Sequence, residues 1–478
     1  MTKTPTTKTP TNEQLHILDL AQTTSDNLMI NALAGTGKTS TLEMIEAVVT
    51  TKPILYLAFN RKIADDASKR MASTTTVRTF NSLGHRIWAA HTKSFKPDSK
   101  KIPDLLRATI AEVKGRETKS RLWDNFWQIT EGVNKARAIG YIPATHAFHK
   151  HSLATGPDLI ASLDEDPDDF TLAEINRFLT KSIHAAYDGY CDFNDQIYMP
   201  ALFGGEFPQF PLTMVDEYQD LNPINHHMVK KLARHRLIGV GDPYQSIYEF
   251  RGAVANGMVQ ATRTHNMTNC DLSISFRCPE AVVNSVHWHV PKFRWLKPGG
   301  HVESLTTLTL SSIPEEATFI CRNNAPLFRL AMRLLASGRS VSVAGSDIGP
   351  RLMAQMKKLG DSSMDQKAVL AAVDEWLEAR LAKGSKTAKD TAECMRVFAT
   401  HAPTLSSAIA YAEHLFAQSG SVKFTTGHKS KGLEFPLVYH LDPWLLADTE
   451  QDKNLAYVIS TRSADTLYEI NSVDIKEH

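Results

Sequence analysis

Residues 28–49 read LMINALAGTGKTSTLEMIEAVV, an apolar run, a glycine loop and a helix-like stretch in direct succession. The apolar residues 28–34 suit a short buried strand, and the apolar spacing after the loop is helical. The backbone N–H groups of such a loop surround phosphates, and the following helix points its positive dipole end at them. A second apolar run, ILYLAF (54–59), precedes another helical pattern. This alternation predicts an α/β fold with a parallel sheet and a phosphate site.

The loop ALAGTGKT (32–39) ends in the GKT of the phosphate-binding P-loop pattern, with Ala32 where the simple pattern has glycine. We expect Lys38 to reach the terminal phosphates of a nucleotide and the Thr39 hydroxyl to bind Mg2+. The loop residues expected to bind the nucleotide are Ala34, Gly35, Thr36, Gly37, Lys38, Thr39 and Ser40.

The composition of the chain leaves its function open. Its 478 residues, 42% hydrophobic and 22% charged, suit a globular protein of roughly two to four domains. No apolar run is long enough for a transmembrane helix, and residues 1–10 (MTKTPTTKTP) are expected to form a disordered leader. The five cysteines lack CxxC spacing, which favours reduced thiols and a cytoplasmic location. A net charge of +1 does not decide whether nucleic acid is bound, because one strand can be held by local groups.

The order of apolar and amphipathic segments predicts two α/β cores that each carry a helical insertion. Residues 11–87 and 196–274 are expected to form the first core, interrupted by a helical insertion at 88–195. Residues 275–345 and 421–478 are expected to form the second, interrupted by a short helical insertion at 346–420. Within the second core, AYVIST (456–461) is predicted to be a strand.

A second part of the nucleotide site is predicted in LTMVDEYQD (212–220). An apolar strand that ends in Asp216 and Glu217 suits an aspartate that organises Mg2+ beside a glutamate that polarises the attacking water. A strand followed by two acidic residues is common at protein surfaces, so the pair indicates a nucleotide site only in combination with the P-loop.

The stretch GDPYQSIYEFRGA (241–253) contains two kinds of residue. Gln245, close to Asp242, is expected to sense the terminal phosphate and its water. Tyr248, Phe250 and Arg251 suit a flat, anionic partner such as a nucleic-acid base and its phosphate. We interpret the stretch as a joint that couples a nucleotide site to a nucleic-acid site.

The series of motifs resembles the UvrD/Rep-type superfamily 1 (1A) DNA helicases, and the resemblance covers nearly the whole chain in family order. The similar segments are TNEQ (11–14), LAGTGKT, AFNRKIA (58–64), RTFNSLG (78–84), VDEYQD, GDPYQSIYEFRGA, SFRCP (275–279), CRNNA (321–325), TTGHKSKGLEF (425–435) and NLAYVISTRS (454–463).

For the nucleotide site, the resemblance implies hydrolysis of Mg2+-bound ATP in a cleft between two tandem RecA-like domains. It implies that Gln14 reads the adenine, that Phe276 stacks on it, and that Glu434, after the turn at Gly432, accepts from the ribose hydroxyl. It also implies that Arg277 and Arg462 are arginine fingers. Surface arginines are usually solvated, and we favour Arg462 because it follows the predicted strand 456–461.

For the nucleic-acid site, the resemblance implies single-stranded DNA and single-strand/duplex junctions as partners. Aromatic residues more often fill cores than stack on bases, so each candidate has a structural alternative. The expected DNA-binding residues are Phe59, Asn60, Phe80, Asn81, Tyr248, Phe250, Arg251, Arg322 and His428.

The chain departs from the family pattern at several positions. It has Asn81 where histidine is frequent, Phe276 where tyrosine is frequent, and Lys453–Asn454 where a basic pair is common. The second insertion (346–420) is shorter than usual, so any regulatory or duplex contact assigned to that insertion is in doubt.

Three functions remain open at this point. The first is an ATP-dependent DNA helicase that moves 3′-to-5′, with polarity inferred from the resemblance alone. The second is a translocase that displaces proteins from DNA and unwinds weakly, which the short second insertion favours. The third is an ATP-regulated loading factor that binds single strands. We expect a monomer in a bacterial or phage-infected cell, with partners in DNA repair, replication or recombination.

Overall fold

The computed structural model describes residues 9–92, 95–247, 254, 256–344 and 348–477. The chain divides into two compact units. The first comprises Met1–Leu163 and Pro167–Ile274, and the second comprises Asp164–Asp166 and Ser275–His478. None of the helices in the described ranges has the length and apolar character needed to cross a membrane.

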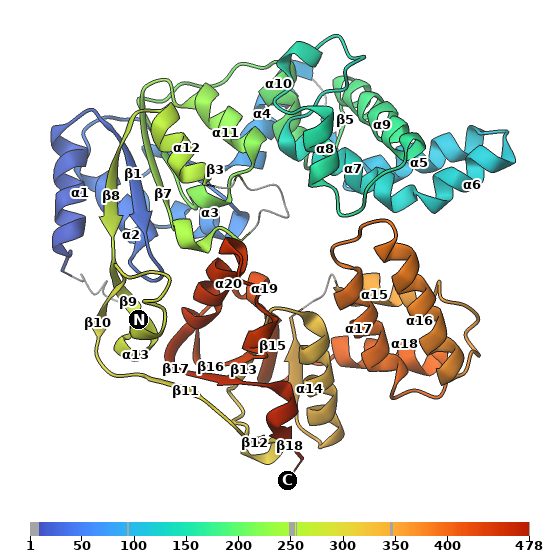
Figure 1. Cartoon of the computed structure of the whole chain (residues 1–478). Helices are drawn as coiled ribbons and strands as arrows, with labels where there is room; N and C mark the ends of the chain where they lie inside the picture. Colours follow the sequence, from blue (N-terminus) through green and yellow to red (C-terminus); the bar gives the residue numbers. More distant parts are fainter. Residues whose placement is uncertain (1–8, 93–94, 248–253, 255, 345–347, 478) are drawn as a thin grey trace. The chain divides into compact units, whose positions relative to one another are not determined.

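The first unit is built on a six-stranded sheet whose strands pair in parallel, in the order β3-β2-β6-β7-β1-β8 (Figure 1). Neighbours in this sheet are far apart in sequence, because β6 and β7 return to it after a long helical region. The strands are β1 (Asn27–Ala32), β2 (Ile54–Ala58), β3 (Thr75–Thr79), β6 (Leu212–Val215), β7 (Arg236–Gly241) and β8 (Met267–Leu272).

Helices cover both faces of this sheet, which explains why its inner strands β2, β6 and β7 are largely apolar and buried. One face packs in a core cluster with α1 (Asn12–Thr23), α2 (Lys38–Val48) and α3 (Arg61–Ser68). The other face packs with α4 (Phe80–Thr92), α11 (Pro223–Leu232) and α12 (Gly257–Thr264). The chain is therefore α/β with a parallel sheet, as the sequence predicts.

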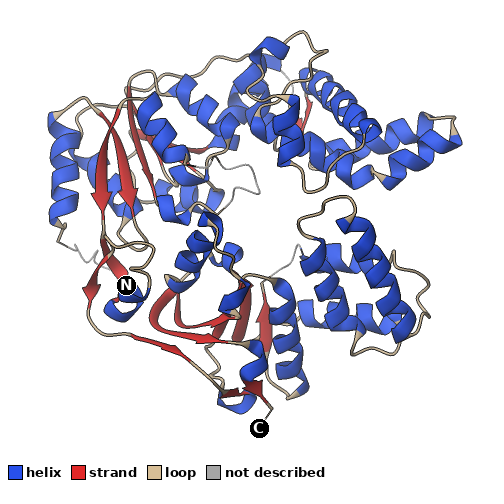
Figure 2. Ribbon diagram, viewed as in Figure 1, coloured by secondary structure: helices blue, strands red, loops and turns tan. Residues whose placement is uncertain are grey.

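A helical region lies between β3 and β6 and has its own core cluster (Figure 2). Besides α4, its helices are α5 (Lys101–Glu112), α6 (Arg116–Asp124), α7 (Phe126–Ile139), α8 (Gly156–Ser162), α9 (Asp169–Tyr187) and α10 (Asp195–Phe203). The short strands β4 (Lys96–Pro97) and β5 (Tyr190–Cys191) pair in parallel within it.

The second unit has another six-stranded sheet with parallel pairing, in the order β11-β17-β16-β13-β15-β14. Its strands are β11 (His301–Ser304), β13 (Thr318–Cys321), β14 (Val341–Val343), β15 (Val422–Thr426), β16 (Phe435–Leu441) and β17 (Ser463–Ile470). Smaller pairs are β9 (Ile274–Pro279) with β10 (Arg294–Lys297), and β12 (Leu308–Thr309) with β18 (Ile475–Lys476).

The helices between β14 and β15 belong to the same hydrophobic cluster as this second sheet. They are α15 (Ile348–Met356), α16 (Gln366–Leu381), α17 (Ala388–Ala399) and α18 (Leu405–Phe416), and the cluster also contains residues of α14 (Asn324–Ala336). The remaining helices of the unit are α13 (Glu280–Ser285), α19 (Gly427–Ser430) and α20 (Glu450–Ser460).

The predicted strand at 456–461 is wrong, because these residues lie at the end of α20 and in the turn after it. Thr449 caps this helix by accepting a hydrogen bond from the backbone N–H of Asp452, and the first turn is acidic, as a helix start favours. Leu455, Val458 and Ile459 are buried at helical spacing. The β-branched run therefore marks the buried side of a helix, and the strand that follows is β17.

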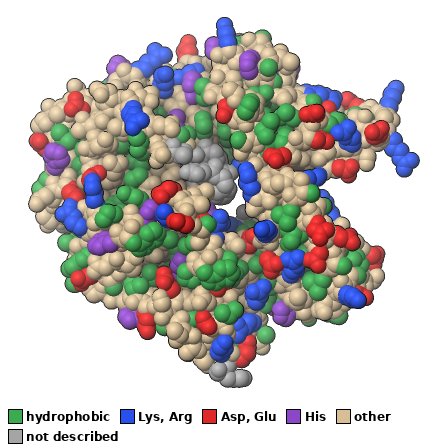
Figure 3. Space-filling view, viewed as in Figure 1, with side chains coloured by type: hydrophobic (Ala, Val, Ile, Leu, Met, Phe, Trp, Pro, Cys, Tyr) green, Lys and Arg blue, Asp and Glu red, His purple; other side chains and the backbone are tan. Residues whose placement is uncertain are grey.

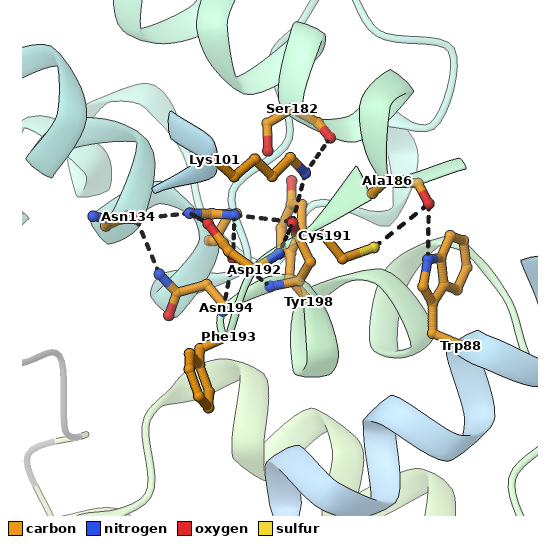
Figure 4. Close-up of polar contacts among 12 residues, drawn as sticks. Trp88, Lys101, Asn134, Ser182, Ala186, Cys191, Asp192, Phe193, Asn194 and Tyr198 are labelled. Carbon is orange, nitrogen blue, oxygen red and sulfur yellow. Dashed lines mark hydrogen bonds and ion pairs between the residues drawn. The ribbon is translucent and has the colours of Figure 1, made fainter. Parts of the chain in front are cut away.

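Both signs of charge are interspersed over the visible surface, in agreement with the net charge of +1 (Figure 3). A cluster of charged side chains is buried in the helical region of the first unit (Figure 4). There, Arg137 binds both carboxylate oxygens of Asp192 at 2.8 Å and one oxygen of Asp195 at 2.9 Å. Lys101 donates to the other Asp195 oxygen at 2.6 Å and to the carbonyl of Ser182 at 2.8 Å.

Mutual pairing keeps these groups charged away from water. Burial alone would raise the pKa of Asp192, but the adjacent Arg137 guanidinium lowers it below its ordinary value. Because the folded pKa is depressed, this contribution to stability is complete above the unfolded pKa and is lost as the pH falls through the folded value. The cluster thereby ties α5, α7 and the start of α10 to one another.

We predict that Arg137→Met lowers the free energy of local opening of α7 and α10 by about 3–5 kcal/mol, because it leaves Asp192 buried without its two-pronged partner. Amide hydrogen exchange of these two helices at neutral pH measures the effect. Arg177→Met is the matched control, since it removes a partly exposed pair with Glu174 and should change opening by less than about 1 kcal/mol. Equal protection in the two variants would contradict a stabilising role for the cluster.

Candidate nucleotide and single-strand sites

The predicted phosphate loop follows β1 and leads directly into α2, which begins at Lys38. Gly35 and Gly37 have φ values of 71° and 85°, a left-handed conformation that favours glycine. The Thr36 hydroxyl donates to the carbonyl of Leu33 at 2.8 Å and closes the turn. The loop therefore has the form needed to direct backbone N–H groups at a phosphate.

Asp216 follows β6 at the carboxyl edge of the same sheet and is 1% exposed. One oxygen of its carboxylate, Oδ2, accepts from the Tyr56 hydroxyl at 2.6 Å and from the Thr39 hydroxyl at 3.4 Å. The other, Oδ1, accepts from the backbone N–H of Glu217 at 2.8 Å. Burial and, next, the charge of Glu217 raise the pKa of Asp216 to about 6, against the opposing effects of Tyr56 and Lys38.

Glu217 adopts a left-handed backbone conformation, with φ 52° and ψ 47°, which is uncommon for a residue other than glycine. Strained residues of this kind persist where the surrounding structure holds them, often at functional sites. Here the Gln219 side chain donates to Glu217 Oε2 at 2.6 Å. The conformation turns the glutamate away from the strand direction immediately after Asp216.

The Gln219 carboxamide also accepts a hydrogen bond from the backbone N–H of Asp242 at 3.0 Å. Asp242 follows β7 and accepts from the Gln245 side chain at 2.8 Å. Gly241 leaves room for this arrangement, because a Cβ at that position would lie 2.4 Å from the Gln219 oxygen. Glu217 is thus linked through buried hydrogen bonds to the start of the predicted joint.

Gln14 lies in α1, with its side chain 4% exposed. Its carboxamide oxygen accepts from the backbone N–H of Thr11 at 3.0 Å, and its nitrogen donates to the Thr41 hydroxyl at 3.1 Å. A carboxamide has a second N–H and a second lone pair, so these bonds leave capacity for recognition of a base. Gln14 is thereby tied to the helix that follows the phosphate loop.

The oxygen groups of Thr39 and Asp216 fit Mg2+, which prefers hard oxygen ligands and retains water and phosphate oxygens in its coordination shell. In the described part of the chain, no group of three or more His, Cys, Asp or Glu side chains is placed to hold a metal. Mg2+ at this edge would take its other oxygen ligands from water and from the phosphates of a bound nucleotide.

In the second unit, two predicted nucleotide-site residues lie together. The Arg277 guanidinium donates through Nε to Glu434 Oε2 at 2.6 Å, and the two side chains are 23% and 61% exposed. Glu434 stands after the exposed turn at Gly432, where φ is 79°. Phe276, beside Arg277 in β9, is half-buried.

Arg462, the second predicted arginine finger, has its side chain buried within the second unit at 1% exposure. Its guanidinium donates to the carbonyls of Val458 and Leu433 at 2.9 and 3.0 Å and to the Thr461 hydroxyl at 3.1 Å. The bond to Leu433 holds the turn that carries Glu434. As described, Arg462 therefore supports that turn and does not present a free guanidinium.

Two further predicted residues follow neighbouring parallel strands of the second sheet and so lie at its carboxyl edge. Arg322 follows β13 and pairs with Asp452 at 2.9 Å, with its side chain 35% exposed. His428 follows β15 in α19 and is half-buried.

The aromatic candidates of the first unit divide into exposed and buried side chains. Phe59 follows β2 and is 37% exposed, whereas Phe80 is 3% exposed and packs in the core cluster beneath the sheet. The prediction that Phe80 stacks on a base is therefore wrong, because its ring fills the core. Asn60 caps α3 by accepting from the backbone N–H of Ile63 at 2.9 Å. Tyr248, Phe250 and Arg251 lie outside the described residues.

Three residues close to the predicted ones were not predicted themselves: Phe193, Gln219 and Tyr56. Asn81 donates to the backbone carbonyl of Phe193 at 2.7 Å, and the Phe193 ring is 62% exposed in a loop held by Asp192 and Asp195. Gln219 lies inside VDEYQD (215–220), but only the fold reveals its partner Asp242, which follows β7. Tyr56 could have been noticed in the sequence, because it is the one residue with a polar group in the otherwise aliphatic strand ILYLA.

Comparisons with known proteins agree with this geometry. Residues 199–266 match the UvrD/REP helicase N-terminal domain. F-box DNA helicase 1 of Gallus gallus is 26% identical over 93% of this chain and 46% of its own length. ATP-dependent DNA helicase PcrA of Leuconostoc citreum is 26% identical over 64% of this chain and 43% of its own length. DNA helicase IV of Escherichia coli is 26% identical over 52% and 43%, respectively.

The chain spans less than half the length of each of these three relatives. The domain match lies on α10, β6, α11, β7 and α12, the elements that position Asp216, Glu217 and Asp242. By sequence, the chain is thus a relative of the UvrD/REP-type helicases.

Proposed function

We propose that the protein is a DNA-dependent ATPase that moves 3′-to-5′ along single-stranded DNA and separates duplex DNA. The observation that carries the proposal is the buried connection from Glu217 through Gln219 to Asp242 and Gln245. It joins a carboxylate suited to activating water to a segment whose continuation contains aromatic and basic residues. The named relatives, which include ATP-dependent DNA helicases, support the same function.

In this proposal, Lys38 and the N–H groups of the phosphate loop bind the β- and γ-phosphates of ATP. Bound Mg2+ would neutralise charge on these phosphates. Thr39 and Asp216 would bind this Mg2+ through their side-chain oxygens. Glu217 orients and deprotonates the attacking water. Gln245, fixed by Asp242, senses the γ-phosphate and its water.

The second unit supplies Arg277 as the candidate arginine finger in the same proposal. Its guanidinium is partly exposed and bonded through Nε, so its terminal nitrogens can turn toward a phosphate. Arg462 contributes indirectly by holding the turn of Glu434, which we propose as the acceptor for the ribose hydroxyl. Phe276 remains the proposed stacking partner of the adenine.

For DNA, the exposed rings of Phe59 and Phe193 are the proposed stacking surfaces in the first unit. Base stacking on an aromatic side chain contributes roughly 1–3 kcal/mol per base and tolerates any sequence. Asn81 fixes the Phe193 backbone, and Arg322 and His428 are proposed phosphate contacts in the second unit.

A protein-displacing translocase with weak unwinding is a second candidate. The observation that favours it is that α15 to α18 share a core cluster with the second sheet, so this region has no separate core among the described residues. Movement of such a region independently of its sheet would expose packed apolar surface, which is unfavourable.

A tailed-duplex assay tests the proposed function. With ATP and Mg2+, the protein should release the short strand from a duplex with a 3′ single-stranded tail and should not release it from one with a 5′ tail. Lys38→Ala should lower both release and ATP turnover at least a hundredfold while retaining single-strand binding, because it loses only phosphate contacts. Lys114→Ala, at an exposed position in the loop between α5 and α6, is the charge-matched control.

Each outcome of this assay bears on a different part of the proposal. Release from the 5′-tailed substrate alone would refute the direction. Weak release with efficient displacement of a protein bound on the tail would favour the translocase. Normal turnover by Lys38→Ala would refute the phosphate site.

We also predict that Gln219→Glu lowers DNA-stimulated ATP turnover at least tenfold while nucleotide affinity stays within twofold of the original. The new carboxylate can still accept from Asp242 N–H, but it repels Glu217 where the amide donated. Steady-state ATPase assays with and without single-stranded DNA measure the effect. Gln209→Glu makes the same change at an exposed position and should behave as the unmodified protein. Unchanged stimulation in Gln219→Glu would show that the connection carries no coupling.

A further inference from the structure

Tyr56 occupies the middle of β2, inside the first sheet, where the rest of the strand is aliphatic. It is 0% exposed and belongs to the core cluster that contains Leu42 and Ile45 of the phosphate-loop helix. A hydrogen bond to the hydroxyl of a buried tyrosine is stabilising, because a buried polar group without one is unfavourable. Its partner here is a charged group of the nucleotide site.

The pairing of β2 with β6 brings the two residues together. Tyr56 lies opposite Met214, and the backbone N–H of Asp216 donates to the Leu57 carbonyl at 3.0 Å, one step beyond the end of β6. The Tyr56 hydroxyl consequently reaches Asp216 Oδ2 at 2.6 Å. A phenol donating to a carboxylate at this distance makes a strong, charge-assisted hydrogen bond.

We propose that Tyr56 is a positioning residue that fixes the orientation of the Asp216 carboxylate toward Thr39 before Mg2+ and nucleotide arrive. This inference rests on the proposed function of the site. Oδ1 is held by the Glu217 backbone and Oδ2 by Tyr56, so the carboxylate is anchored at both oxygens. Its Oδ2 atom then lies 3.4 Å from the Thr39 hydroxyl, the second proposed metal-side oxygen.

Fixing the carboxylate in advance favours metal binding, because less side-chain freedom is lost when the metal arrives. Tyrosine suits this role, since its ring has only two rotatable side-chain bonds and here is enclosed in the core. Tyr56 touches neither the phosphates nor the reacting water in this scheme, and it acts only through Asp216.

Tyr218 provides an internal comparison two residues after Asp216. It is also 0% exposed, but it packs in the core cluster on the other face of the sheet. Its hydroxyl has no hydrogen-bond partner among the described residues. Tyr56→Phe and Tyr218→Phe therefore each remove one hydroxyl from a fully buried tyrosine. Only Tyr56 donates a hydrogen bond to Asp216.

The test measures metal binding itself, with Mn2+ as the spectroscopic probe. Binding of Mn2+ to the full chain at saturating ADP is followed by electron paramagnetic resonance, and binding of ADP alone is measured by calorimetry in EDTA. We expect Tyr56→Phe to weaken Mn2+ about tenfold, the size of one hydrogen bond to a charged group. Its affinity for metal-free ADP should stay within twofold of the original.

Tyr218→Phe is the matched control and should bind Mn2+ within twofold of the original protein. In an Asp216→Asn background, Tyr56→Phe should cause less than a twofold further change, because the carboxylate on which it acts is gone. Equal Mn2+ affinity in Tyr56→Phe and the original protein would overturn the inference, as would an equal loss in metal-free ADP binding. Failure of the original protein to bind Mn2+ with ADP would instead refute the proposed nucleotide site.

Discussion

The parallel pairing of β6 between β2 and β7 is the constraint on which the candidate site depends. Parallel strands place their carboxyl ends at one edge of a sheet, where ligands of α/β proteins bind. The phosphate loop follows β1, Asp216 follows β6 and Asp242 follows β7. More than 200 positions of sequence separate the phosphate loop from Asp242. Without this register, Gln219 could not bridge Glu217 and Asp242.

Buried carboxylates have different neighbours in two parts of the first unit. In the helical region, Lys101 and Arg137 compensate Asp192 and Asp195, and Asp192 also accepts hydrogen bonds from the backbone of the loop that carries Phe193. At the sheet edge, Asp216 lies beside another carboxylate and its pKa is raised to about 6. A neighbouring carboxylate destabilises the ionised form of Asp216, whereas a neighbouring cation would stabilise it. This environment suits a carboxylate whose negative charge is neutralised only when a ligand binds.

Local chemistry explains which features the sequence predicted. The phosphate loop and the Asp216–Glu217 pair are contiguous motifs next to apolar strands, so residue type and spacing were sufficient to predict their positions after β1 and β6. The prediction for 456–461 was wrong because buried β-branched residues occur in helices as well as strands, and the cap at Thr449 lies outside the apolar run. Phe80 was misassigned because a motif does not reveal which way a ring points.

Other features depend on contacts across long stretches of chain and had no local signal. Arg277 and Glu434 are 157 positions apart, and Asn81 and Phe193 are 112 apart. The role of Tyr56 likewise depends on the register of β2 with β6. In each case the sequence supplied the residue types, and the fold supplied their partners.

We propose above all that the chain converts ATP hydrolysis into movement along single-stranded DNA. Stopped-flow fluorescence of oligothymidylates labelled at the 5′ end, with a series of lengths, tests it most directly. We expect the label signal to arrive after a delay that increases linearly with oligonucleotide length, and only when ATP and Mg2+ are present. A time course that is the same for every length would contradict the claim.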